Sequence, residues 1–283
     1  MFNWQSDYFS PDNIDEKLPN VLLWQNSLLI EQKNGLANWG MKLSQRMWTP
    51  DEIKIPEAQP FDRPYAGFLE FEQHSALYST EISQKIWLAF GVMGPASGTE
   101  QLQGSIHKVI GASTPLGWQH QIENTPTGQL AYEIDYLLLR HSAPFDSQWE
   151  VSTFNHNTLS NVRSDINVGL TFRWGLNLEK TFGRLSSHFG HVGNLIEDSK
   201  SQSLLFYTRL QTGYRFNDLT FDGNLPYESK VEFNPKQASA TTGLSYYFPG
   251  GSVTWSFNVY NKEYLTDSKN WHGYGLLQFS WSI

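Results

Sequence analysis

The residues with the clearest potential for chemistry are a glutamine and a histidine in the longest predicted insertion, residues 94–127. Gln103 and His107 are four positions apart, so a helix places them on one face. An imidazole with a near-neutral pKa can take a proton from water and act as a general base. Because single histidines are more often solvated or structural than catalytic, a structural role for His107 also stays open.

Apolar spacing predicts the helix that would carry this pair. Leu102, Ile106, Val109 and Ile110 fall at i, i+4, i+7 and i+8, which gives one apolar stripe along a helix. We expect this stripe to dock on the rest of the protein, with Gln103 and His107 on a neighbouring face. The remaining sequence must therefore supply a wall against which the helix packs.

Outside this insertion, apolar and polar residues alternate with the period of β-strands. The last segment, for example, alternates Leu277, Phe279, Trp281 and Ile283 with polar residues up to the end of the chain. Apolar runs such as residues 86–93 are far shorter than the ~20 residues of a membrane-spanning helix. The pattern predicts twelve strands, at residues 2–9, 20–31, 36–47, 64–77, 80–93, 128–141, 148–157, 163–174, 203–217, 235–248, 252–263 and 271–283.

The fold class indicated is all-β: a twelve-stranded antiparallel transmembrane β-barrel with a short helix in an extracellular loop, forming a single domain over residues 1–283. The aromatic share of 15% fits the aromatic girdles of such barrels. A soluble all-β protein is the alternative, but few helices are predicted to cover so many apolar strand faces. No secretory leader follows Met1, so we expect a chain that is either not exported or has lost its signal peptide.

Composition narrows the possible activities further. The chain has no cysteine, which excludes disulfides, thiolate metal sites and cysteine nucleophiles. A net charge of −8 without a basic stripe argues against nucleic acid as a partner. His188 and His191, three positions apart, are a weaker alternative metal site.

A series of motifs, densest over residues 44–124, resembles the outer-membrane lipid A 3′-O-deacylase family. The resemblance depends on the order and spacing of the motifs together, since each motif alone is weak. Beyond residue 128 only the rhythm of the strands agrees. The motifs are Gln45-Arg46-Met47-Trp48-Thr49-Pro50, Asp62-Arg63-Pro64-Tyr65-Ala66-Gly67, Gly91-Val92-Met93-Gly94-Pro95, Gln103-x-x-x-His107 and Gly117-Trp118-Gln119-His120-Gln121-Ile122-Glu123-Asn124.

The resemblance implies an esterase in the bacterial outer membrane that hydrolyses the 3′-linked acyloxyacyl ester of lipid A. In that family a histidine activates water and a calcium ion stabilises the oxyanion. His107 matches the base and Gln103 its polar partner one helical turn earlier. Asp7 matches the family's calcium-binding carboxylate, and Ser6 stands where the family has asparagine. Both offer the hard oxygen atoms that Ca²⁺ prefers.

Three basic residues are expected to contact the lipopolysaccharide substrate. Arg63 matches a family Asp-Arg pair, Lys54 lies near the position of a family basic residue, and Lys108 is next to the predicted base. Cationic side chains at the membrane rim could hold lipid A phosphates. For Asp62 and Arg63 a structural role in bracing the loop is an equal alternative, since turn-forming Pro64 and Gly67 are beside them.

Two other functions stay open. A catalytically silent barrel of the same family is suggested by Ser6 and by residues 19–24, which lack the family's Tyr-Thr-x-Gly element. A passive outer-membrane pore or adhesin would use the polar inner face and the loops without His107. The expected partners are lipopolysaccharide and outer-membrane lipid, and no protein partner is predicted. Residues 175–202, a long connection on the side of the short turns, receive no predicted role.

Overall fold

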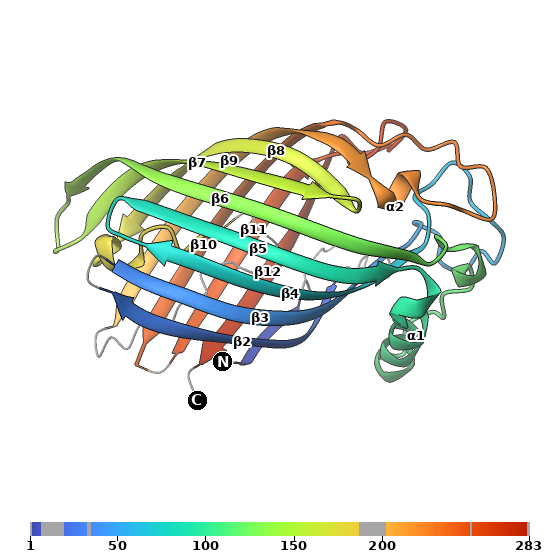
Figure 1. The fold of residues 1–283 in the computed structure, drawn as a ribbon, viewed down its shortest axis with the longest axis horizontal. Coiled ribbons are helices and arrows are strands. Elements are labelled where there is room, and N and C mark those ends of the chain that lie inside the picture. Colours follow the sequence, from blue (N-terminus) through green and yellow to red (C-terminus); the bar gives the residue numbers. More distant parts are fainter. Residues whose placement is uncertain (1, 7–19, 33–34, 187–201, 250, 282–283) are drawn as a thin grey trace.

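The computed structural model describes residues 2–6, 20–32, 35–186, 202–249 and 251–281 (Figure 1). Asp7, His188 and His191 lie outside these residues, so the predictions made for them stay predictions. The strands are β1 (Phe2–Ser6), β2 (Asn20–Gln32), β3 (Gly35–Trp48), β4 (Ala66–Tyr78), β5 (Ile82–Met93), β6 (Thr125–Ser142), β7 (Gln148–Ser160), β8 (Arg163–Gly175), β9 (Ser203–Asp218), β10 (Lys236–Phe248), β11 (Gly251–Asn261) and β12 (Trp271–Trp281). The helices are α1 (Thr99–Ile110) and α2 (Leu219–Asp222), with 3₁₀ turns η1 (Pro95–Ser97), η2 (Trp118–His120) and η3 (Leu178–Thr181).

Within the described residues, the strands form one antiparallel sheet in the order β1-β12-β11-β10-β9-β8-β7-β6-β5-β4-β3-β2. Each strand from β2 to β12 pairs with its sequence neighbour, and β1 pairs with β12, with Phe2 opposite Trp281. The sheet curls round on itself (Figure 1). The prediction of an all-β antiparallel fold is confirmed.

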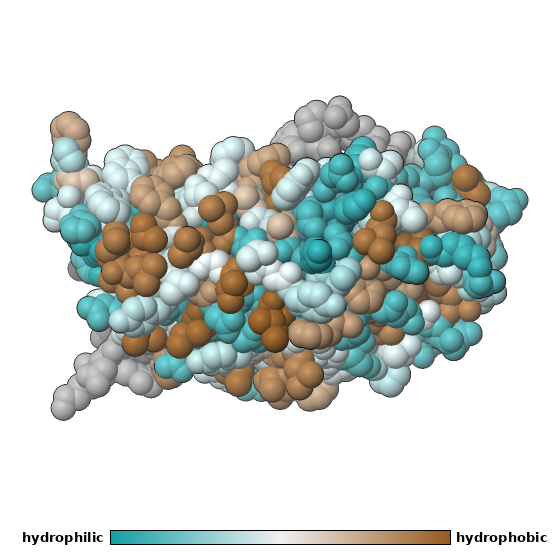
Figure 2. Space-filling model, turned by 90° about the horizontal axis from the view of Figure 1, so that it is seen from above, coloured by the Kyte–Doolittle hydropathy of each residue, from teal (hydrophilic) through white to brown (hydrophobic). Residues whose placement is uncertain are grey.

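The polarity of the two faces of the sheet is the reverse of that in a protein with an apolar core. In β8, Asn167, Thr171 and Arg173 face inward and are at most 3% exposed, whereas Val168 and Leu170 face outward and are about half exposed. Figure 2 shows apolar residues over much of one outer face. A wall that is polar inside and apolar outside is expected for strands surrounded by lipid, which disfavours the soluble alternative. No helix in the described part of the chain has the length and apolarity needed to cross a membrane.

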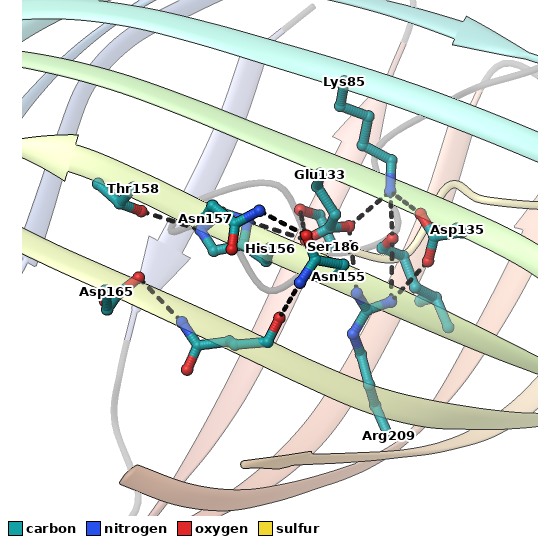
Figure 3. A network of polar contacts seen from close by, with 12 residues as sticks. Lys85, Glu133, Asp135, Asn155, His156, Asn157, Thr158, Asp165, Ser186 and Arg209 are labelled. Atoms are coloured by element: carbon teal, nitrogen blue, oxygen red, sulfur yellow. Dashed lines mark hydrogen bonds and ion pairs between the residues drawn. The ribbon is translucent and has the colours of Figure 1, made fainter. Parts of the chain in front are cut away.

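The interior contains an ionic network that joins β5, β6 and β9 (Figure 3). Lys85 Nζ on β5 lies 2.7 Å from both Glu133 Oε1 and Asp135 Oδ2 on β6. Arg209 of β9 reaches the same two carboxylates, at 3.1 and 3.2 Å, and its guanidinium lies over the Phe154 ring. Each buried charge thus has partners of opposite sign, which offsets the cost of its desolvation.

The segment after β8 enters this interior from the end with the short turns. Leu178 and Leu185 are at most 3% exposed and pack with Leu205 and Tyr207. The carbonyl oxygen of Leu185 accepts a 2.8 Å hydrogen bond from Lys85 Nζ. Residues 176–186, for which the sequence suggested no role, therefore form a plug on the ionic network.

Most of the described strand ends lie within two residues of the predicted ranges, and β7 runs three residues further, to Ser160. Two of the differences have clear physical causes. β4 begins at Ala66 rather than residue 64, because Pro64 has no N–H to donate to the ladder. β6 begins at Thr125 rather than residue 128, because the end of β5 continues to pair with it, with Met93 opposite Thr125.

Candidate functional site

Helix α1 follows β5 at the end of the sheet that carries the long loops (Figure 1). Gly98 and Gly111 limit the helix, both with positive φ, a conformation that glycine adopts without steric cost. Thr99, Gln103 and His107 form the packed face of the helix and are 1%, 3% and 4% exposed. The helix contacts β3 and β4. The packed face is thus its polar face.

This orientation corrects the expectation that the apolar stripe of the helix docks on the protein. Val109 is 86% exposed, and Leu102 and Ile106 are only partly buried. Leu102 touches the cluster formed by Met47, Tyr65 and Trp118. In water such exposure would be unfavourable, but a helix beside a lipid-facing wall can leave apolar side chains outward at little cost.

The His107 ring is fixed by one hydrogen bond to the backbone. Its Nδ1 lies 2.5 Å from the carbonyl oxygen of Ser113, in the loop just after the helix. A carbonyl oxygen only accepts, so Nδ1 carries the proton and a neutral ring has its lone pair on Nε2. No other described residue forms a hydrogen bond with the ring. In the neutral ring, the Nε2 lone pair is therefore available to accept a proton, as a general base must.

Gln103 is fixed by a second hydrogen bond. Trp118 Nε1 donates to Gln103 Oε1 over 2.8 Å. The Trp118 side chain is 2% exposed and its ring centre lies 5.0 Å from that of Tyr65. Burial raises the pKa of Tyr65 to about 12, so its hydroxyl stays protonated and donates to the Ile53 carbonyl oxygen.

The loop around Trp118 is joined to residues 49–65 by backbone hydrogen bonds. Leu116 N donates to Ile53 O over 2.8 Å, and Ile122 N donates to Tyr65 O over 3.0 Å. Sequence reasoning missed the roles of Ser113, Trp118 and Tyr65. Trp118 and Tyr65 lie in two of the motifs that carried the resemblance, and those motifs could have indicated both residues. No sequence pattern distinguished Ser113.

Arg63 lies in a separate cluster that crosses the mouth of the sheet. Its NH1 lies 3.0 Å from Glu263 Oε2, and its guanidinium is over the Phe221 ring. Its neighbour Asp62 accepts a 3.1 Å hydrogen bond from the Tyr264 hydroxyl. Arg63 is only 6% exposed and is paired with a distant loop, which fits the bracing role, while its Nε and Nη2 atoms have no hydrogen-bond partner among the described residues. Its predicted contact with lipid A phosphate stays a prediction.

The other predicted site residues are not brought into contact with His107 by the described geometry. Lys54 and Lys108 are exposed to solvent. Ser6 ends β1, where its backbone is opposite Leu277, and its side chain is not described. Within the described residues, no group of three or more acidic or histidine side chains could hold a metal ion.

A curled antiparallel sheet with a polar interior, an apolar outer wall and long loops at one end defines the class of outer-membrane β-barrel proteins. The family model described as "Outer membrane protein LpxR" matches residues 1–283, and the chain belongs to this family. It is therefore an outer-membrane protein, as predicted.

The solved structure of a protein from Salmonella agrees with this fold. LpxR from Salmonella typhimurium is 16% identical and superposes with a TM-score of 0.82, covering 92% of this chain and 88% of that one. The β domain of the Bordetella autotransporter BrkA is 11% identical, with a TM-score of 0.49 over 93% of this chain and 89% of that one. No curated protein matches the sequence.

Proposed function

We propose that this protein is a lipid A deacylase that hydrolyses the 3′-linked acyloxyacyl ester of lipopolysaccharide in the outer leaflet. One observation carries the proposal: His107 is held by Ser113 with Nε2 unpaired, on a helix packed beside the wall of the sheet. Family membership and the resemblance of residues 44–124 to lipid A deacylases support the choice of substrate.

In the proposed reaction, His107 Nε2 takes a proton from water as the water oxygen attacks the ester carbonyl carbon. A new C–O bond forms and the carbonyl becomes a tetrahedral oxyanion. When it collapses, the bond to the 3′ oxygen of the sugar breaks, and His107 returns the proton to that oxygen. The products are a fatty acid and a 3′ hydroxyl. The Ser113 carbonyl keeps the ring oriented throughout and stabilises the imidazolium that forms transiently.

Calcium is part of the proposal, with Ser6 and Asp7 as protein ligands. Their donor atoms are a hydroxyl and a carboxylate, the hard oxygens that suit Ca²⁺, which takes six to eight such ligands. Ca²⁺ bound there would supply positive charge for the ester oxyanion. No serine or threonine nucleophile is then required, because His107 activates water directly.

The outward face of α1 suits a substrate that arrives from the membrane. Val109, Leu116 and Ile55 are exposed apolar residues on α1 and the two loops beside it, and their exposure continues the apolar outer wall. Acyl chains can stay in lipid while only the ester reaches His107. The exposed Lys54 and Lys108 are proposed to attract lipid A phosphates.

We further propose that β1 and β2 complete a closed twelve-stranded barrel whose lumen does not conduct. Closure would satisfy the free edges of both strands, which is required in lipid. The ionic network and the plug of residues 176–186 fill the interior. This filling argues against the passive pore.

The deciding experiment is mass spectrometry of lipid A incubated with refolded protein, in parallel with calcium and with a chelator. Loss of the 3′-acyloxyacyl mass only with calcium supports the proposal in full. Loss in both samples supports the deacylase and contradicts the metal. No change with folded protein contradicts the proposal and favours a silent member of the family.

A further inference from the structure

Trp118 lies where it determines the orientation of the Gln103 amide. An indole N–H only donates, and the two ends of an amide group differ, one accepting and the other donating. With Trp118 Nε1 2.8 Å from Gln103 Oε1, the reversed amide would place two donors face to face. The amide nitrogen, Nε2, therefore points away from the indole.

That amide nitrogen lacks a protein partner in the described part of the chain. Gln103 is 3% exposed as a whole, yet its amide nitrogen is not sealed from solvent, so it is free to donate to a bound oxygen. Gln103 is also one helical turn before His107, on the same buried face of α1. Gln103 Nε2 can thus donate a hydrogen bond to an ester oxygen, while His107 Nε2 on the same face can accept a proton from water.

The indole is held firmly in its place. Its ring packs on Tyr65 and Met47, which belong to the loop before β4 and to β3. Gly117 lets the two rings come this close, since a Cβ at residue 117 would lie 2.5 Å from Tyr65 Cε2. The orientation of the Gln103 amide is thus fixed through Trp118 by residues of the sheet, and not only by helix α1.

We propose that Trp118 is a positioning residue, which directs Gln103 Nε2 to donate a hydrogen bond to an oxygen of the ester as His107 activates water. The inference rests on the proposed deacylase function. It assigns Trp118 no contact with substrate. Without the indole N–H, the Gln103 amide samples both orientations, and only one of them is productive.

The test uses W118F, which keeps an aromatic ring but removes the N–H, and Y65F as the matched control, which removes a buried hydroxyl on the neighbouring ring. We expect W118F to lower kcat about tenfold with KM unchanged, and Y65F to leave kcat within about twofold. Q103A should lower kcat at least as much as W118F, and W118F/Q103A should equal Q103A alone. Heat-modifiable migration on gels verifies that each variant is folded.

A second readout is independent of activity. The indole N–H signal of Trp118, assigned by its loss in W118F, should exchange with solvent faster in Q103A than in the wild type. Unchanged exchange in Q103A overturns the hydrogen bond itself. Wild-type kcat in W118F, or losses that multiply in the double variant, overturns the inference while the proposed function stands. A folded wild type without turnover overturns both.

Discussion

The Nδ1 atom of His107 lies 2.5 Å from the backbone carbonyl oxygen of Ser113, six residues further along the chain. The proposed base is thus oriented by a neutral group and not by a carboxylate. Gly111, with φ of 72°, turns the chain sharply after α1 and returns Ser113 toward the helix. The ring orientation is therefore set locally, whatever substrate or ion is bound.

Replacement of the base should stop the reaction. We expect H107A to lower turnover by about 10²- to 10⁴-fold, the usual contribution of a general base. His120 provides the matched control, because it lies in the same insertion but packs edge-on against Tyr227. H120A should keep at least about half of the wild-type activity. Mass spectrometry of lipid A measures the activity of both variants. Near-normal turnover by folded H107A would contradict the assignment of His107 as the general base.

Removal of the proposed metal ligand should alter the calcium requirement rather than the fold. D7A loses a carboxylate and should need about tenfold more calcium for half-maximal activity. S6N supplies the amide oxygen that the resemblance implies at this position and should need less calcium than the wild type. Titration of activity against free calcium distinguishes the three proteins. Three identical titration curves would show that this pair does not bind the activating ion.

Arg63 is predicted to brace the extracellular loops. R63M and E263Q both remove the 3.0 Å ion pair, and E263Q leaves the buried Arg63 without its carboxylate partner. Glu263 keeps Arg163 at 3.4 Å in R63M, so the cost there should be below the cost of about 3–5 kcal/mol for breaking a fully buried pair. Both should therefore increase proteolysis of residues 219–235 and 262–270. E228Q, which affects the exposed Lys230 pair, should change nothing.

Enzyme kinetics separate this role from phosphate binding. Bracing predicts that R63M and E263Q change KM in parallel. A several-fold increase of KM in R63M alone would instead indicate that Arg63 contacts the substrate.

The plug predicts a barrel that does not conduct and a specific way to open it. At Gly183, φ is +71° and a Cβ would lie 2.1 Å from Ser83 Cβ. G183V should displace residues 176–186 and produce current steps in planar bilayers, whereas the wild type should produce none. G128A is the control, since a Cβ there meets nothing within 4 Å. Current steps of equal size in the wild type would support the alternative of a passive pore.

The sequence predicted the strands well because an outer wall in lipid imposes strict alternation. Val168 and Leu170 have to face lipid and Asn167 and Thr171 the lumen, and that period is visible without a structure. The spacing also predicted that Gln103 and His107 share one face of a helix, which the structure confirms, while their catalytic roles stay predictions.

Other features depended on contacts between distant segments. The docking face of α1 was predicted wrongly, because apolar periodicity does not show whether the apolar side meets protein or lipid. The contact of Arg63 with Glu263, 200 residues away, leaves no local pattern. The plug of residues 176–186 could not be predicted for the same reason, because its partners Lys85 and Arg209 are on strands distant in the sequence.

The pairing of β1 with β12 joins two strands from opposite ends of the described chain. Phe2 is opposite Trp281 and Ser6 is opposite Leu277, so the first strand finds its partner only when the last has been delivered. Contacts of such long sequence separation form slowly. Before that pairing forms, the strand that carries Ser6 has no fixed place relative to His107. On the proposed mechanism, the protein would therefore be inactive until β12 pairs with β1.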